Sequence, residues 1–160
     1  MNKFLKLIYI YLFTLLILFS CSDKYTSNNF EKAAIHRENG DLMNSIKLLH
    51  GIVKNNRNEQ DKQRAQFNIA DIYMNDVKDY SFALDNFDKV LKYNIDNDIH
   101  KKSLFMFAYI CSNYLDMYSD AYISYEKFIV KYPEDDLIAS VKYEIEQLQP
   151  YIDTIKKLID

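Results

Sequence analysis

The feature that most constrains this chain is an internal repeat with a period of 38 residues. Segment 67–91 aligns with segment 105–129 without a gap, and apolar and small residues coincide along the whole length. The identical pairs are Phe67/Phe105, Ala70/Ala108, Ile72/Ile110, Asn75/Asn113, Tyr80/Tyr118, Ser81/Ser119, Ala83/Ala121 and Lys89/Lys127. A repeat of this length is the sequence signature of a stacked array of similar structural units.

Each copy of the repeat predicts two helices. In the first, apolar residues follow the i, i+3, i+7 spacing of one helical face from Phe67 onward. In the second, they follow i, i+4, i+7, i+8 from Ala83. A polar segment over 76–79 separates the two helices. Because each helix carries a small alanine, we expect close helix–helix contacts at Ala70, Ala83, Ala108 and Ala121.

The order of residues resembles the tetratricopeptide repeat. A small residue late in the first helix is followed by an aromatic residue after the turn, then alanine, an aromatic residue and an apolar pair. Pro133 stands where that family often closes a repeat. The usual turn glycine is absent from both copies, and each turn is one residue longer than the family pattern. The resemblance implies an all-α fold, a short right-handed solenoid of antiparallel helix pairs.

A degraded first repeat precedes the two clear ones. Residues 41–54 match 79–92 at the same shift of 38, whereas residues 30–35 match 67–72 at a shift of 37. The first turn is therefore one residue shorter, and there Gly40 and Asp41 match the family's usual Gly-Asp pair. We expect repeats over about 29–59, 63–97 and 101–133. A terminal helix pair follows over 134–160, with Pro150 ending its first helix.

The N-terminus has the pattern of a targeting segment. Lys3 and Lys6 precede an apolar run over 7–19, which is short for a membrane-spanning helix and ends at Ser20 and Cys21. The sequence Leu-Phe-Ser-Cys over 18–21 resembles the lipobox of bacterial lipoproteins, although Phe19 is larger than that family's usual residue. An uncleaved anchor helix is the alternative.

The lipobox resemblance implies a lipoprotein signal peptide over 1–20 and a lipid on Cys21, the first mature residue. Residues 21–28 would form a tether to the membrane. The protein would then belong to a bacterial cell envelope, and Ser22 after the cysteine favours the outer membrane. If Cys21 is acylated, Cys111 has no disulfide partner, and we interpret it as a small buried hydrophobic residue.

No pattern indicates catalysis. His36, His50 and His100 stand in separate repeat segments, and a chain with two glycines cannot easily build a phosphate-binding loop. The formal net charge of −3 gives no reason to expect nucleic acid. We therefore expect no enzyme activity, no cofactor, no metal site and no small-molecule substrate.

By match to the family pattern, the first helix of each repeat would line a groove that binds a partner. The expected groove residues are Arg64, Phe67, Asp71, Asn75, Lys102, Phe105, Tyr109 and Asn113. Phe67 and Phe105 are as compatible with packing as with binding. The alternative surface is the side of the second helices, with Asp85, Lys89, Tyr122 and Glu126.

The sequence thus predicts a lipid-anchored envelope scaffold or adaptor that binds an envelope protein or peptide segment and reaches the membrane through Cys21. It looks like the repeat lipoproteins of outer-membrane barrel assembly, which makes outer-membrane protein assembly one setting for it. The alternative is a non-catalytic accessory subunit of an envelope or cell-wall enzyme.

Overall fold

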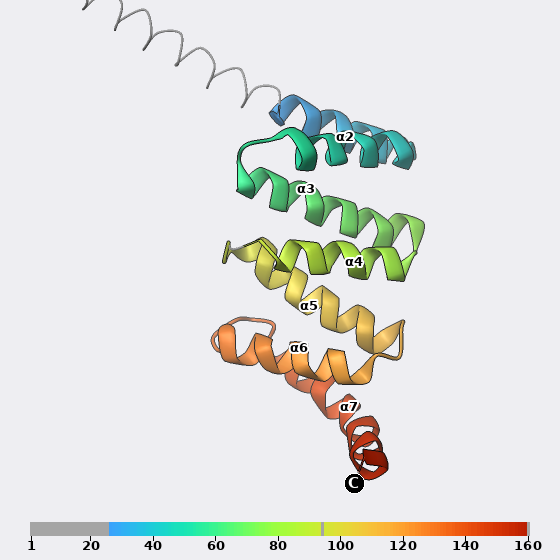
Figure 1. The fold of residues 1–160 in the computed structure, drawn as a ribbon, viewed down its shortest axis with the longest axis vertical. Coiled ribbons are helices and arrows are strands. Elements are labelled where there is room, and N and C mark those ends of the chain that lie inside the picture. The colour runs from blue at the N-terminus through green and yellow to red at the C-terminus, as the bar shows by residue number, and fades with distance from the viewer. Residues whose placement is uncertain (1–25, 94, 160) are drawn as a thin grey trace, which may run out of the picture. The chain divides into compact units, whose positions relative to one another are not determined.

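The computed structural model describes residues 26–93 and 95–159, and every regular element in these ranges is helical. The elements are a helix over 26–38, α2 (Leu42–Asn55), α3 (Glu59–Ile72), a π-helical segment η1 (Tyr73–Val77), α4 (Tyr80–Leu91), α5 (Asp98–Asn113), α6 (Tyr118–Lys131) and α7 (Ile138–Ile159) (Figure 1). Helix α4 packs on α5, α5 on α6, and α6 on α7. The predicted all-α array of helix pairs is confirmed.

The predicted signal peptide, Cys21 and the first part of the tether lie outside the described residues. The last part of the tether was predicted wrongly, because residues 26–28 already belong to a helix. Thr26 is buried there and its hydroxyl accepts a hydrogen bond of 3.0 Å from the Asn56 amide. The array therefore begins at or before residue 26.

The chain divides into two compact units, residues 1–65 and 66–160. In the first unit, the helix over 26–38 packs against α2. The hydroxyl of Ser45 donates a hydrogen bond of 2.7 Å to the Ala33 carbonyl oxygen. Ser45 occupies the repeat position of Ala83 and Ala121, so a small residue again permits close approach of two helices.

The second unit contains two connected groups of buried side chains. One includes Ala70, Ala83 and Phe87 and joins α3 to α4. The other includes Ala108 and Ala121 and joins α5, α6 and α7. The four alanines predicted at helix contacts are all fully buried. This result confirms the helical register read from the repeat.

The turns inside the three repeats share a left-handed backbone residue at the 38-residue period. Gly40 has φ of 75°, Lys78 has φ of 61° and Asp116 has φ of 54°. Glycine adopts this conformation without steric cost, whereas a side chain at Cβ makes it unfavourable. The second and third repeats thus have no glycine at this position of the turn, but the residue there adopts the same left-handed backbone conformation.

Backbone hydrogen bonds show the different turn lengths that the alignment indicated. In the first repeat, the Asp41 amide donates to the His36 carbonyl, five residues back. In the second, the Asp79 amide donates to the Tyr73 carbonyl, six residues back, and in the third Met117 donates to Cys111 at the same separation. In the second repeat, the π-helical segment η1 accommodates the extra residue.

Helix α7 corrects the predicted terminal helix pair. It is one helix that continues through Pro150, which was expected to end it. Proline removes one backbone hydrogen bond and crowds the preceding turn. The helix persists because Leu148 and Ile152, on either side of Pro150, are both buried in the core of the second unit.

The second helix of each repeat starts at a residue with a similar backbone conformation, but only two of the three are capped. The Asp41 carboxylate accepts a hydrogen bond from the Asn44 amide, and Asp79 accepts one from Phe82. Met117 stands at the same position before α6, with φ of −88° and ψ of 60°, and caps nothing. Asp41 has nearly the same angles, φ of −84° and ψ of 65°.

We predict that Met117→Asp raises the free energy of unfolding by about 0.5–2 kcal/mol, because the new carboxylate can bond the first free amides of α6. Urea denaturation of the purified variant measures this change. Met117→Asn is the matched control, since it caps without adding a charge beside Asp116 and Asp120. A loss of stability in both variants would contradict the proposed capping geometry.

Candidate interaction surfaces

The eight predicted groove residues are divided between the two units. Arg64 belongs to the first unit, where its guanidinium lies 3.6 Å from the centre of the Phe30 ring. The other seven belong to the second unit. Asp71 and Asn75 hydrogen-bond to each other at 2.7 Å on the exposed side of α3 and η1. Lys102 is exposed on α5.

Phe67 and Phe105 take part in packing. The Phe67 ring meets the Phe87 ring edge-on at 5.7 Å, and the Phe105 ring meets the buried rings of Tyr125 and Phe128 at 6.0 and 6.2 Å. Both phenylalanines are only partly accessible. The sequence left open whether these two phenylalanines pack in the protein or bind a partner, and the contacts favour packing.

Tyr109 and Asn113 lie together near the end of α5. The Asn113 amide donates a hydrogen bond of 3.1 Å to the Tyr109 carbonyl oxygen, and it lies 3.5 Å from the Glu144 carboxylate on α7. Both side chains are at least partly accessible to solvent. The structure thus joins this pair to a charged group of another helix.

A groove with a volume of about 620 Å³ opens on the side of the second helices. Helix α6 provides most of its wall, the first two turns of α5 contribute, and α4 adds its last residue. We call it the α6 groove. Its lining residues are Leu91, His100, Leu104, Tyr122, Ile123, Glu126, Lys127, Val130 and Lys131.

The α6 groove carries apolar side chains that no helix of the described residues covers. Ile123 is 50% exposed and Val130 is 80% exposed. The opposite face of α6 is already buried through Ala121, Tyr125 and Phe128. Helix α6 therefore has one apolar face in the core and a second one in the groove, which is more than a helix at the surface of an isolated domain needs.

The alternative surface expected on the side of the second helices belongs only in part to the α6 groove. Tyr122 and Glu126 line the α6 groove. Asp85 and Lys89 form an ion pair of 2.5 Å on α4 and do not line it. Ile123 and Val130 were not identified from the sequence, because apolar residues at helical spacing usually pack in a core.

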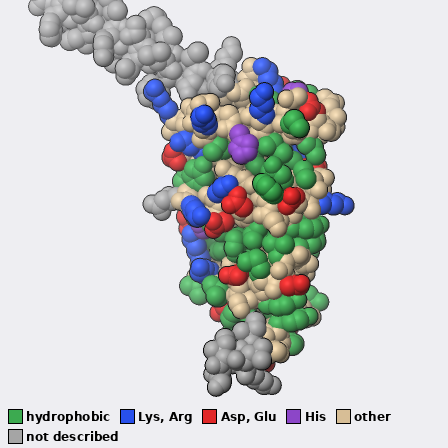
Figure 2. Space-filling model, turned by 45° about the vertical axis from the view of Figure 1, so that its right-hand side comes forward, with side chains coloured by type: hydrophobic (Ala, Val, Ile, Leu, Met, Phe, Trp, Pro, Cys, Tyr) green, Lys and Arg blue, Asp and Glu red, His purple; other side chains and the backbone are tan. Residues whose placement is uncertain are grey.

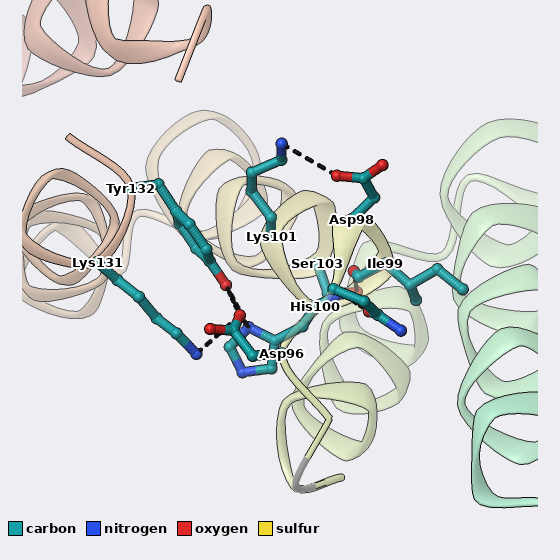
Figure 3. A network of polar contacts seen from close by, with 9 residues as sticks. Asp96, Asp98, Ile99, His100, Lys101, Ser103, Lys131 and Tyr132 are labelled. Atoms are coloured by element: carbon teal, nitrogen blue, oxygen red, sulfur yellow. Dashed lines mark hydrogen bonds and ion pairs between the residues drawn. The ribbon is translucent and has the colours of Figure 1, made fainter. Parts of the chain in front are cut away.

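Polar contacts fix one end of the α6 groove (Figure 3). The Tyr132 hydroxyl donates a hydrogen bond of 2.5 Å to the Asp96 carboxylate, and the Lys131 ammonium lies 3.2 Å from the same oxygen. His100 Nδ1 lies 3.0 Å from the Tyr132 oxygen. These contacts tie the segment before α5 to the end of α6.

The hydrogen bond from Tyr132 also determines the tautomer of neutral His100. The only phenolic proton goes to Asp96, so Nδ1 must donate its proton to the Tyr132 oxygen. Burial lowers the pKa of His100, the nearby Lys131 charge acts in the same direction, and Asp96 opposes both. Neutral His100 is therefore the form that suits the folded protein.

We predict that the folded protein loses stability at low pH because His100 becomes protonated. Its folded pKa lies below the unfolded value of about 6.5. The contribution of neutral His100 to the free energy of unfolding is therefore complete above about pH 6.5, and it is lost as the pH falls through the folded pKa. Urea denaturation at about pH 7.5 and about pH 5 should show a smaller pH effect in His100→Gln than in the wild type.

The comparison variant is His50→Gln, which replaces an exposed histidine of α2 and measures the pH effect of a histidine outside this contact. An NMR titration that gives His100 a folded pKa above about 6.5 would contradict the prediction.

Within 26–93 and 95–159, no three His, Cys, Asp or Glu side chains lie close enough to hold a metal ion. Cys111 is fully buried, and burial raises the pKa of its thiol to about 12, so the unreactive thiol dominates near neutral pH. This agrees with its interpretation as a small hydrophobic residue.

The face drawn in Figure 2 has hydrophobic side chains at the surface in patches, with both signs of charge interspersed. In the same described ranges, no helix is both long and apolar enough to cross a membrane.

No protein-family model matches this chain, and no curated protein has a significantly similar sequence. The resemblances to tetratricopeptide repeats and to bacterial lipoproteins therefore depend on the residues quoted above.

Proposed function

We propose that this chain is a lipid-anchored scaffold of a bacterial cell envelope, which holds a segment of another envelope protein in the α6 groove. The observation that carries the proposal is the second apolar face of α6, with Val130 80% exposed beside Ile123. Burying an apolar side chain of this size contributes about 1.5–3 kcal/mol, which makes such a face a natural contact for a partner.

The proposed occupant is an amphipathic helix of the partner protein. Its apolar stripe would cover Ile123 and Val130, whose side chains are exposed in the groove. Glu126 and Lys127 are neighbours on α6 and both line the groove, and neither forms an ion pair with another described residue. A helix with one basic and one acidic residue beside its apolar stripe would complement both charges.

The envelope location in this proposal depends on the lipobox-like sequence that ends at Cys21. A lipidated Cys21 would keep the helical array at the membrane while leaving the groove accessible, and several acyl chains on one residue anchor a protein stably. Outer-membrane protein assembly is one process in which such a scaffold could serve, by holding segments of its partners near the membrane.

We predict that Cys21→Ser abolishes lipid attachment, because the lipid has no other site in a lipoprotein. Cell fractionation should find the wild type in the membrane pellet and the variant as an unprocessed precursor or a released protein. Mass spectrometry of the wild type should find acyl mass on Cys21. A mature N-terminus elsewhere, without acyl mass, would contradict the anchoring part of the proposal.

We predict that Val130→Asp and Ile123→Asp abolish partner capture, because each places a charge in the apolar part of the groove. Proteins are captured from detergent-solubilised envelopes on wild-type and variant baits and quantified by mass spectrometry. The matched control is Met43→Asp, which changes an apolar residue of α2 that is 81% exposed and lies outside the groove.

The proposal requires a protein that binds both the wild type and Met43→Asp but neither groove variant. Circular dichroism and thermal melting should show that all four proteins are folded. If the same proteins bind all four baits, the α6 groove is not the partner site.

A further inference from the structure

A cluster of aromatic and polar side chains lies near the end of α5, on residues that the α6 groove does not use. Tyr109 and Tyr114 have their rings 6.0 Å apart at an angle of 71°. Tyr80 stacks on Tyr114 at 3.7 Å with an angle of 13° between the rings, which holds the Tyr114 ring in place. Tyr114 is nevertheless 42% exposed, so part of this aromatic surface faces solvent.

Helix α7 brings a carboxylate next to Asn113, the residue that precedes Tyr114. The Glu144 carboxylate lies 3.5 Å from the Asn113 amide nitrogen, and the same nitrogen donates a shorter hydrogen bond of 3.1 Å to the Tyr109 carbonyl oxygen. The bond to Glu144 is long enough to be weak, so both carboxylate oxygens keep the capacity to accept. We call Tyr109, Tyr114 and Glu144 the tyrosine–glutamate site.

Glu144 lacks a counter-charge. It is partly buried, and no Lys, Arg or His side chain in the described ranges forms an ion pair with it. A partly desolvated carboxylate gains more from an opposite charge than a fully hydrated one does. The pKa of Tyr109 is raised by burial first, then by Tyr114 and by the Glu144 charge.

We propose that the tyrosine–glutamate site binds a cationic side chain, Arg or Lys, of a partner protein. The faces of tyrosine rings attract cations, and a carboxylate forms charge-assisted hydrogen bonds with guanidinium or ammonium groups. An anionic group would be repelled by Glu144. A neutral sugar could stack on a ring, but it would leave the carboxylate without a counter-charge.

The chemistry of this site differs from that of the α6 groove. Here a single cation is recognised by aromatic rings and one carboxylate, whereas the groove takes an apolar stripe. The two sites share no residue, and the chain's net charge of −3 favours the approach of basic partners in general. The inference can therefore hold whether or not the α6 groove binds a helix.

The test uses the full chain in detergent and a fluorescein-labelled tri-arginine peptide, with its tri-glutamine analogue as the uncharged probe. Fluorescence anisotropy is measured at about 150 mM salt, where long-range attraction is screened. We expect the tri-arginine peptide to bind and Glu144→Gln to weaken it about tenfold, as loss of a charge-assisted contact over aromatic rings should. Glutamine keeps an oxygen that can accept from Asn113.

The matched control is Glu146→Gln, which removes the same charge from an exposed position two residues further along α7. Its effect should remain below about twofold, because an exposed charge contributes little. Equal effects of the two variants would show attraction to net charge alone and overturn the site. Equal binding of the tri-glutamine peptide would show stacking without charge recognition, and would equally overturn it.

NMR of the wild-type chain gives a readout that does not depend on any variant. On addition of the tri-arginine peptide, the amide signals of Tyr109, Tyr114 and Glu144 should shift. The absence of binding, or shifts confined to other residues, would overturn the inference.

Discussion

The close contact between the two helices of each repeat is the interaction on which the rest of the structure depends. Small residues stand on the helix faces that meet: the Ala33 carbonyl oxygen accepts from Ser45, Ala70 and Ala83 share one buried cluster, and Ala108 and Ala121 share another. In the first pair, the contact is close enough for the Ser45 hydroxyl to bond a carbonyl of the neighbouring helix. A left-handed residue in each turn lets the chain reverse between these helices, and the second and third repeats retain it without glycine.

These constraints explain why much of the fold could be predicted from the sequence. The 38-residue period contains the apolar spacing, the alanines and the turn positions together, so a single alignment identifies all three. The prediction failed where contacts outweigh local preference. Pro150 usually ends a helix, but Leu148 and Ile152 are buried on both sides of it and hold α7 together. The start of the first helix was predicted after residue 28 rather than at or before residue 26, because the polar residues over 26–28 resemble a tether.

The interaction surfaces were less predictable, because they depend on which apolar residues remain uncovered. The repeat pattern gives Phe67, Ile123 and Val130 the same character, yet the structure packs the first and exposes the other two. The tyrosine–glutamate site combines Tyr109 with Glu144, which are joined only by the packing of helices in the second unit. Tyr109 was predicted as a groove residue from the family pattern, whereas no local signal in the sequence indicates Glu144.

The central claim is that the uncovered apolar face of α6 is where this protein holds its partner. Site-specific photo-crosslinking in living cells tests the claim most directly, with a photoreactive phenylalanine analogue placed at Val130 or, as the control, at Met43, which is equally exposed and apolar on α2. The account predicts a discrete crosslinked product of defined mass from position 130 and none from position 43. Products of equal yield from both positions, or a product from position 43 alone, would contradict it.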